Sequence, residues 1–96
     1  MSRTVTLRIK RRFFDEILAG TKLIEYRDAK AFYHQLFASE KGRVSRLRLH
    51  YQQRRTLEAT VDSINLVSAP DTYLKTTGLA FGTQVYAIVL RNAQLV

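Results

Sequence analysis

The stretch Leu7-Arg-Ile-Lys-Arg-Arg-Phe-Phe-Asp-Glu-Ile-Leu-Ala-Gly-Thr-Lys-Leu-Ile-Glu-Tyr-Arg27 changes its hydrophobic period twice. Apolar and polar residues alternate over 4–10, which predicts a strand with one buried face. Apolar residues then fall at helical spacing over 13–18, which predicts a short amphipathic helix ending at Gly20. The two-residue period returns over 22–27, where we expect a second strand. The chain therefore begins as strand, helix and strand.

Beyond this stretch the sequence predicts one more helix and three more strands. A second short helix begins near Asp28, a residue that caps helix N-termini well, and ends at Gly42. Three segments alternate as strands do: 44–51, 57–67 and 84–91. The hydrophobic phase slips at Asp62-Ser63, which predicts a β-bulge. Segment 70–82 is expected to form a loop or a short helical turn.

Five strands with two short helices inserted early predict an α+β fold. We expect a small, mostly antiparallel β-barrel, because closing the sheet removes its exposed edges. The 96 residues hold one domain that spans 1–96, and a hydrophobic content of 46% is typical of a packed domain.

The composition excludes several classes of protein. The chain has no Cys and two widely spaced His, so it has no disulfide scaffold, no thiol nucleophile and no ordinary zinc site. We expect neither a metal nor another cofactor. No apolar run is long enough to span a membrane, and the N-terminus lacks a secretory stretch. The sequence therefore predicts a soluble, cytoplasmic protein, and nothing in it requires more than a monomer.

Positive charge is concentrated in the first half of the chain. The formal net charge is +8, and the first 55 residues hold fourteen of the sixteen basic and five of the eight acidic residues. This asymmetry is typical of a protein that binds a polyanion such as RNA, although it also serves solubility. The candidate phosphate contacts are Arg46, Arg48, Arg54 and Arg55. A solvated strand face explains Arg46 and Arg48 equally well.

The segment Gly20-Thr-Lys-Leu-Ile-Glu-Tyr-Arg27 contains the pattern Gly-x-Lys-x-x-Glu-x-Arg. With the preceding strand, which ends in Lys10, and the short helix, it resembles the opening of the ASCH family of the PUA-like superfamily. Segment 85–90 is similar to the last strand of that family. The resemblance implies a compact β-barrel with a cleft beside the signature residues, and a function in RNA or modified-nucleoside biology.

Three signature residues form a possible hydrolytic set. Glu25 and Arg27 are two apart on a predicted strand and share a face, and Lys22 begins that strand. A desolvated Lys acts as base or nucleophile, a carboxylate positions it or moves a proton, and an Arg stabilises an oxyanion. Without the resemblance, the same residues would be interpreted as an ordinary ion pair and a solvated lysine.

The resemblance extends to small bacterial amidohydrolases that remove the acyl group from acetylated cytidine. It implies that Lys22 is the base or nucleophile and that Arg27 forms the oxyanion hole. Glu25 stands where those enzymes have Thr, and their downstream Glu has no clear match here. We therefore expect Glu25 to serve as the carboxylate partner of Lys22. The implied substrate is a nucleoside or nucleobase, namely an N-acylated cytidine or cytosine.

Three further residues are candidates for substrate binding. Lys10 ends the first strand and can line the same cleft, and Tyr26 and Tyr86 can stack on a base. The ordinary alternatives are a surface lysine and two core aromatic residues. The sequence thus supports a metal-independent amidohydrolase first, and an RNA-binding module or ribonuclease second. A binding domain without catalysis is a third hypothesis.

Overall fold

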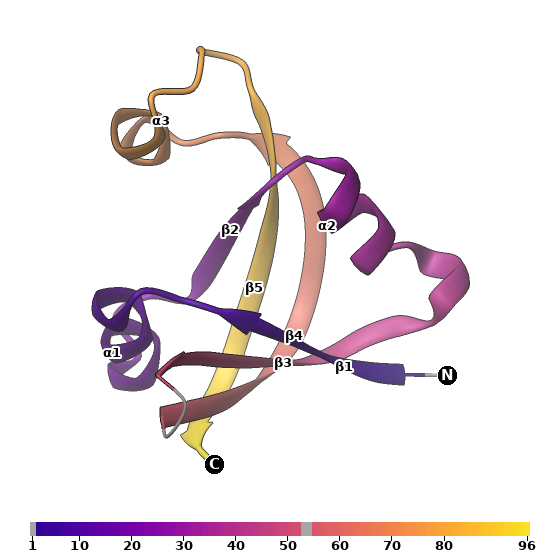
Figure 1. Cartoon of the computed structure of the whole chain (residues 1–96), viewed down its shortest axis with the longest axis vertical. Coiled ribbons are helices and arrows are strands. Elements are labelled where there is room, and N and C mark those ends of the chain that lie inside the picture. The colour runs from indigo at the N-terminus through magenta and orange to yellow at the C-terminus, as the bar shows by residue number, and fades with distance from the viewer. Residues whose placement is uncertain (1, 53–54) are drawn as a thin grey trace.

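The computed structural model of the chain describes residues 2–52 and 55–96 (Figure 1). The strands are β1 (Ser2–Arg8), β2 (Ile24–Asp28), β3 (Arg43–Gln52), β4 (Arg55–Ser68) and β5 (Gln84–Leu95). The helices are α1 (Arg11–Ala19), α2 (Ala31–Leu36) and α3 (Asp71–Thr77), with a 3₁₀ turn at Ser39–Lys41. The order of elements confirms the α+β class, with a third short helix where a loop or helical turn was expected.

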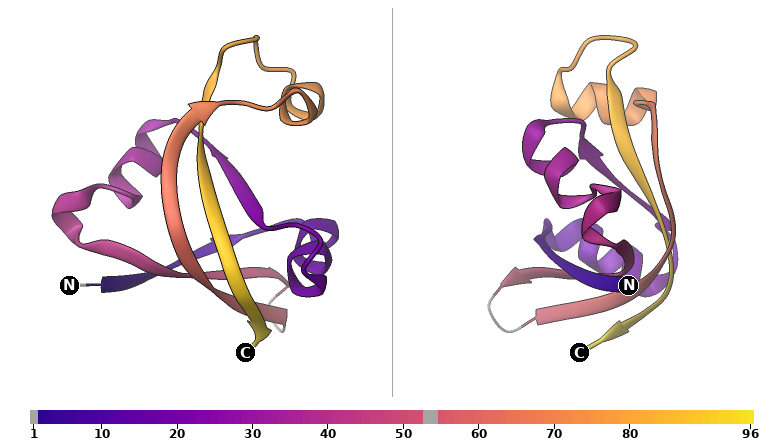
Figure 2. Two further views of the ribbon diagram at one scale, coloured as in Figure 1. Left: turned by 180° about the vertical axis from the view of Figure 1, so that it is seen from behind. Right: turned by 90° about the vertical axis from the view of Figure 1, so that its right-hand side faces the viewer.

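The five strands form one curved sheet in the order β1-β3-β4-β5-β2. β1 pairs with β3 in parallel, and the other three pairs are antiparallel. The right-hand view of Figure 2 shows that α2 and α3 lie on the same face of the sheet at β4 and β5. The mostly antiparallel sheet is as expected.

The expected closure into a barrel is not found in the part of the chain that the structure describes. β1 and β2 remain the two edges of the sheet. The two edge strands of the described sheet are joined by a side chain and not by backbone hydrogen bonds between strands. Nη2 of Arg27 on β2 donates to the carbonyl oxygen of Arg8 on β1 at 2.7 Å.

The first two helices differ in how well the sequence predicted them. α1 ends where expected, because Gly20 adopts the left-handed conformation that helix C-termini favour (φ 80°). α2 begins at Ala31 rather than near Asp28 and ends at Leu36, well before Gly42. Asp28 does not cap this helix, since it is the last residue of β2 and its carboxylate accepts a hydrogen bond from Tyr73.

The predicted bulge in β4 is confirmed. Val61 pairs with Leu90 and Ser63 pairs with Val89, so Asp62 is the extra residue. β5 has a second irregularity at Asn92, a residue with φ 55° that lies near the register shift between Glu58 and Thr60. Because the chain resumes its pairing after Asn92, β5 continues to Leu95, beyond the predicted end at Arg91.

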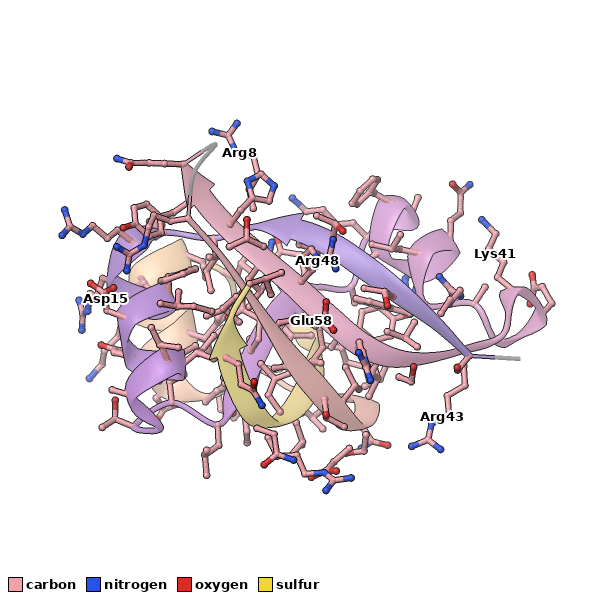
Figure 3. The ribbon with its side chains drawn as sticks, turned by 90° about the horizontal axis from the view of Figure 1, so that it is seen from below. Arg8, Asp15, Lys41, Arg43, Arg48 and Glu58 are labelled. Carbon is pink, nitrogen blue, oxygen red and sulfur yellow. The ribbon has the colours of Figure 1, made fainter. Side chains whose placement is uncertain are left out.

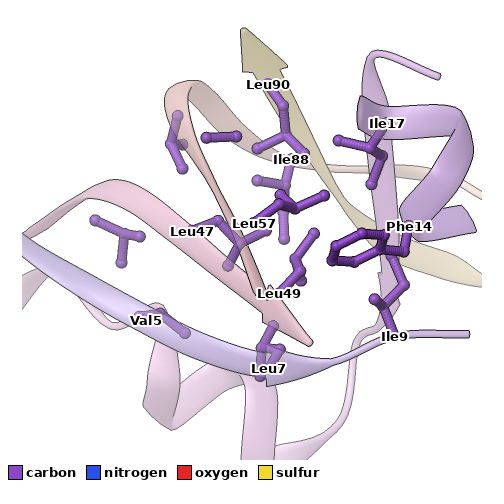
Figure 4. Packing of buried hydrophobic residues seen from close by; sticks show 13 residues of the cluster. Val5, Leu7, Ile9, Phe14, Ile17, Leu47, Leu49, Leu57, Ile88 and Leu90 are labelled. Atoms are coloured by element: carbon purple, nitrogen blue, oxygen red, sulfur yellow. The ribbon is translucent and has the colours of Figure 1, made fainter. Parts of the chain in front are cut away.

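One hydrophobic core fills the inside of the curved sheet (Figure 4). It draws on β1, α1, β3, β4 and β5, through Val5, Leu7, Ile9, Phe14, Ile17, Val44, Leu47, Leu49, Leu57, Ala59, Val61, Ile88 and Leu90. Phe14 is fully buried and meets the ring of Tyr51 edge to face, with 4.8 Å between the ring centroids. This contact fixes α1 on the sheet and so places the segment that follows it.

No helix in the described residues has the length and apolarity needed to cross a membrane.

Candidate active site

A pocket of about 480 Å³ lies between the β1–α1 corner, β2, α2 and α3. The ribbon segments around it can be followed in Figure 1. Its charged lining consists of Arg8, Lys10, Lys22, Glu25, Arg27 and Asp28. Its aromatic and aliphatic lining consists of Ile9, Phe13, Tyr26, Tyr33 and Tyr73. A volume of this size and a lining that combines aromatic rings with a few polar groups are typical of small-molecule sites.

Glu25 is buried at the wall of this pocket, with 5% of its surface exposed. Its two carboxylate oxygens face different cations. Oε2 lies 2.7 Å from Nη2 of Arg27 and accepts a hydrogen bond from Nε at 2.9 Å, whereas Oε1 lies 3.6 Å from Nζ of Lys22. The three predicted catalytic residues therefore form one chain of ion pairs, with the carboxylate in the middle.

The alternation of β2 produces this arrangement. β2 pairs with β5, with Glu25 opposite Ile88 and Arg27 opposite Tyr86, so the two charged side chains share one face as expected. Lys22 precedes the strand, and its ammonium group folds back to donate to the carbonyl oxygen of Ile24 at 2.6 Å.

Arg27 makes the largest set of polar contacts in the site. Besides Glu25, it donates to the hydroxyl of Tyr33 at 3.2 Å and to the carbonyl of Arg8 at 2.7 Å. Burial by itself would lower the pKa of Arg27, but the charge of Glu25 and the contact with Tyr33 raise the pKa above its ordinary value. Arg27 is therefore a fixed positive charge.

Lys22 lies between two aromatic rings. Its Nζ is 5.2 Å from the ring centroid of Phe13 and 5.5 Å from that of Tyr26, and 18% of its side chain is exposed. Cation–π contacts of this kind stabilise an ammonium group and hold it in place. The amine is thus oriented by one carbonyl, one carboxylate and two rings, and it still reaches the pocket.

Asp28 and Tyr73 connect α3 to the end of β2. The hydroxyl of Tyr73 donates to Oδ1 of Asp28, and Lys30 lies 3.2 Å from the other carboxylate oxygen. The hydrogen bond from Tyr73, with help from Lys30, holds the pKa of Asp28 below its ordinary value. Burial is the main cause that raises the pKa of Tyr73 well above that of a free phenol, and the hydrogen bond to Asp28 raises it further.

The structure brings together five of the six residues that the sequence assigned to the site and its substrate, namely Lys10, Lys22, Glu25, Tyr26 and Arg27. Tyr86 is the exception. It shares the face of Arg27, but α2 covers it: His34 Nδ1 lies 2.5 Å from the Tyr86 hydroxyl, and the ring of Phe37 packs against it at 5.0 Å. Tyr86 therefore stabilises the position of α2 and does not line the pocket.

The arginines predicted to contact phosphate do not form one free basic strip. Arg46 and Arg48 lie on the outer face of β3, as expected, but both bind Glu58 on β4, at 2.9 and 2.7 Å. Figure 3 shows Arg48 beside Glu58. The two guanidinium groups lower the pKa of Glu58. Arg55 lies 5.9 Å from the ring of Phe14, and Arg54 is outside the described residues.

Several residues of the pocket were not singled out from the sequence. Tyr33 falls within the predicted second helix, Asp28 is predicted to cap that helix, and Tyr73 falls in the segment expected to form a loop or a helical turn. Arg8 contributes through its position at the end of β1. The only signal for Tyr73 was an aromatic residue in a polar segment, which does not indicate that α3 returns to the end of β2.

The described residues offer no cluster of metal ligands, and comparison with known proteins identifies no relative. In residues 2–52 and 55–96, no three His, Asp or Glu side chains come together as a metal site would require. Comparison of the chain with protein-family models, with curated proteins and with solved structures found no match.

Proposed function

We propose that this protein is a metal-independent amidohydrolase that removes the acyl group from N-acylated cytidine or cytosine. One observation carries the proposal: Lys22, Glu25 and Arg27 form a continuous chain of ion pairs on the wall of a pocket of about 480 Å³. A base, a carboxylate and an oxyanion donor are the groups that metal-free amide hydrolysis needs. The resemblance of residues 20–27 to the ASCH signature supports the same choice of substrate.

The pocket suits a planar heterocyclic substrate. Phe13, Tyr26, Tyr33 and Tyr73 line it with aromatic rings. A nucleobase presents a flat ring that packs against such side chains, and polar groups at its edge can be bound by the charged wall. The acyl amide on the exocyclic nitrogen would then lie beside the amine of Lys22.

In the proposed reaction Lys22 acts as the general base. Its unprotonated amine takes a proton from a water molecule, and the water oxygen adds to the acyl carbon. Arg27 stabilises the resulting oxyanion, because its Nη1 donates one hydrogen bond, to Tyr33, and has a second N–H for the substrate. Lys22 then returns the proton to the amide nitrogen, the C–N bond breaks, and the oxyanion collapses to a carboxylic acid, which loses its own proton to solvent. The free cytosine amine leaves, and Lys22 is unprotonated again.

Glu25 positions the two cations. Because Lys22 and Arg27 carry like charge, they would repel each other in this partly buried site, and the carboxylate between them offsets that repulsion. Once Lys22 has taken the proton from water, the three groups carry one net positive charge, which favours the negative charge on the acyl oxygen.

The test is an ultraviolet assay of acetylcytidine with the purified protein in the presence of a metal chelator. We expect the wild type to form cytidine, and Lys22→Ala and Lys22→Arg to lose the activity by at least about a hundredfold. Lys22→Arg retains the charge but cannot act as a base. Lys75→Ala, at an exposed lysine of α3, is the matched control and should retain wild-type turnover. A wild-type protein that leaves acetylcytidine unchanged at high enzyme concentration would contradict the proposal.

RNA binding or cleavage is the outcome that such a failure would favour. It would appear as binding of single-stranded RNA that weakens steeply with salt, since phosphate contacts release counterions. Turnover of a neutral nucleoside would respond little to salt.

A further inference from the structure

The positive charge of the pocket is unevenly compensated. Glu25 pairs with Lys22 and Arg27, and Asp28 pairs with Lys30. Arg8 and Lys10 also line the pocket, and neither has a carboxylate within ion-pair distance in the described residues. The surplus positive charge is therefore located at the β1–α1 corner.

This corner has a fixed position relative to the proposed catalytic residues. Arg27 donates to the carbonyl of Arg8 at 2.7 Å, which fastens the end of β1 to β2. Ile9, between the two cations, is buried in the core, and its N–H donates to the carbonyl of His50 at 2.9 Å. The backbone is thus held on both sides, while the side chains of Arg8 and Lys10 are exposed and reach solvent at the pocket (Figure 3 labels Arg8).

Neighbouring basic residues are engaged elsewhere. Arg11 and Arg12, the next two residues of the chain, pair with Asp15 and Glu16 one turn along α1, at 3.8 and 3.4 Å. The cations left for a ligand at this corner are therefore Arg8 and Lys10. Together they provide a guanidinium and an ammonium, the two groups that most often bind phosphate in proteins.

We propose that Arg8 and Lys10 form an anion-binding subsite, which binds a phosphate group attached to the nucleoside in the pocket. The aromatic lining receives the base, and the β1–α1 corner receives a phosphate monoester or diester. This inference rests on the proposed function for the identity of the base. It narrows the substrate class from a free nucleoside to a nucleotide, free or within RNA.

The test measures binding rather than turnover, so that it is independent of catalysis. Calorimetry compares cytidine with cytidine 5′-monophosphate, and with a short oligocytidylate that has no terminal phosphate. We expect at least one phosphate-bearing ligand to bind about tenfold more tightly than cytidine at low salt, and this gain to shrink as salt is added. Preference for the monophosphate indicates a free nucleotide, whereas preference for the oligonucleotide indicates RNA.

In the variant R8Q/K10Q the gain is expected to be abolished, so that neither phosphate-bearing ligand binds more tightly than cytidine binds to the same variant. Its matched control is R43Q/K75Q, which removes the same charge from two exposed cations without a carboxylate partner in the described residues. Arg43 is at the opposite end of the β1–β3 pair from Arg8 (Figure 3). Circular dichroism confirms that both variants fold.

Three results would overturn the subsite. They are equal affinity for cytidine and both phosphate-bearing ligands, an equal loss in R8Q/K10Q and R43Q/K75Q, and no binding of any of the three ligands. Hydrolysis of acetylcytidine without a phosphate effect would retain the proposed function and remove the subsite. If phosphate raises the affinity through Arg8 and Lys10 but acetylcytidine is not hydrolysed, the subsite is retained and the proposed function is removed.

Discussion

Arg27 donates from Nη2 to the carbonyl oxygen of Arg8 at 2.7 Å, and the same guanidinium holds the buried carboxylate of Glu25. One side chain therefore joins the two edge strands of the open sheet and compensates a buried charge in the pocket. Stability and the proposed chemistry depend on the same residue, and this dependence can be measured.

Removing Arg27 should destabilise the fold strongly. Arg27→Ala leaves Glu25 buried with Lys22 as its remaining cation at 3.6 Å, and it removes the link to Arg8. We expect the free energy of unfolding, measured in urea, to fall by about 3 kcal/mol. The control is Arg91→Ala, which removes an exposed arginine paired with Asp62 and should cost less than about 1 kcal/mol. Equal losses in the two variants would show that the Arg27 contacts contribute no more than a surface ion pair.

Glu25 provides a separate test of the proposed activity. Glu25→Gln retains the shape of the side chain but removes the charge that separates Lys22 from Arg27, so we expect turnover of acetylcytidine to fall about a hundredfold. Glu58→Gln is a closely matched control, since Glu58 also lies between two basic side chains but on the outer face of the sheet. Comparable losses in both variants, or none in Glu25→Gln, would remove Glu25 from the reaction.

The local patterns were sufficient to predict most of the fold. Alternation identified every strand, and the phase slip at Asp62 identified the bulge, because side-chain direction in a strand depends on the parity of the sequence. The parallel pairing of β1 with β3 and the open edge between β1 and β2 were not predictable in this way. They depend on how distant segments meet, and hydrophobic period carries no information about that.

The same distinction applies to the pocket. Lys22, Glu25 and Arg27 were predictable because they are close in sequence and share one strand face. Tyr73 was missed because its contact with Asp28 joins residues far apart in the chain. Tyr86 does not line the pocket: parity placed it beside Arg27 but could not show that α2 covers it.

Tyr73 should ionise at unusually high pH. Burial and the hydrogen bond to Asp28 both raise its pKa, so an alkaline ultraviolet titration should show one of the five tyrosines ionising well after an ordinary phenol. Asp28→Asn removes the negative charge and should move this step to lower pH, whereas Asp62→Asn, at an exposed carboxylate, should leave it in place. A wild-type titration without a late step would contradict the Tyr73–Asp28 contact.

Asp28 should also contribute to acid sensitivity. Its pKa is lower in the folded protein than the ordinary 3.8, so the folded state binds the proton less readily than the unfolded state. The contribution to stability is therefore present above about pH 4 and is lost as the pH falls through the lower folded value. In urea unfolding, Asp28→Asn should be less stable than the wild type at neutral pH, and the difference should shrink in acid. A constant difference at all pH values would assign the loss to shape rather than charge.

Asn92 tests the irregularity near the end of β5. Its φ of 55° lies in the left-handed region, which Asn tolerates, Gly adopts freely and Ala adopts at a cost. We expect Asn92→Ala to lower the free energy of unfolding by about 1 kcal/mol, and Asn92→Gly to change it by less than half of that. Gln94→Ala, two residues further along β5 in the resumed pairing, is the control for loss of a polar side chain. If Asn92→Gly is as damaging as Asn92→Ala, the backbone conformation is not the cause, and the side chain of Asn92 itself stabilises the bulge.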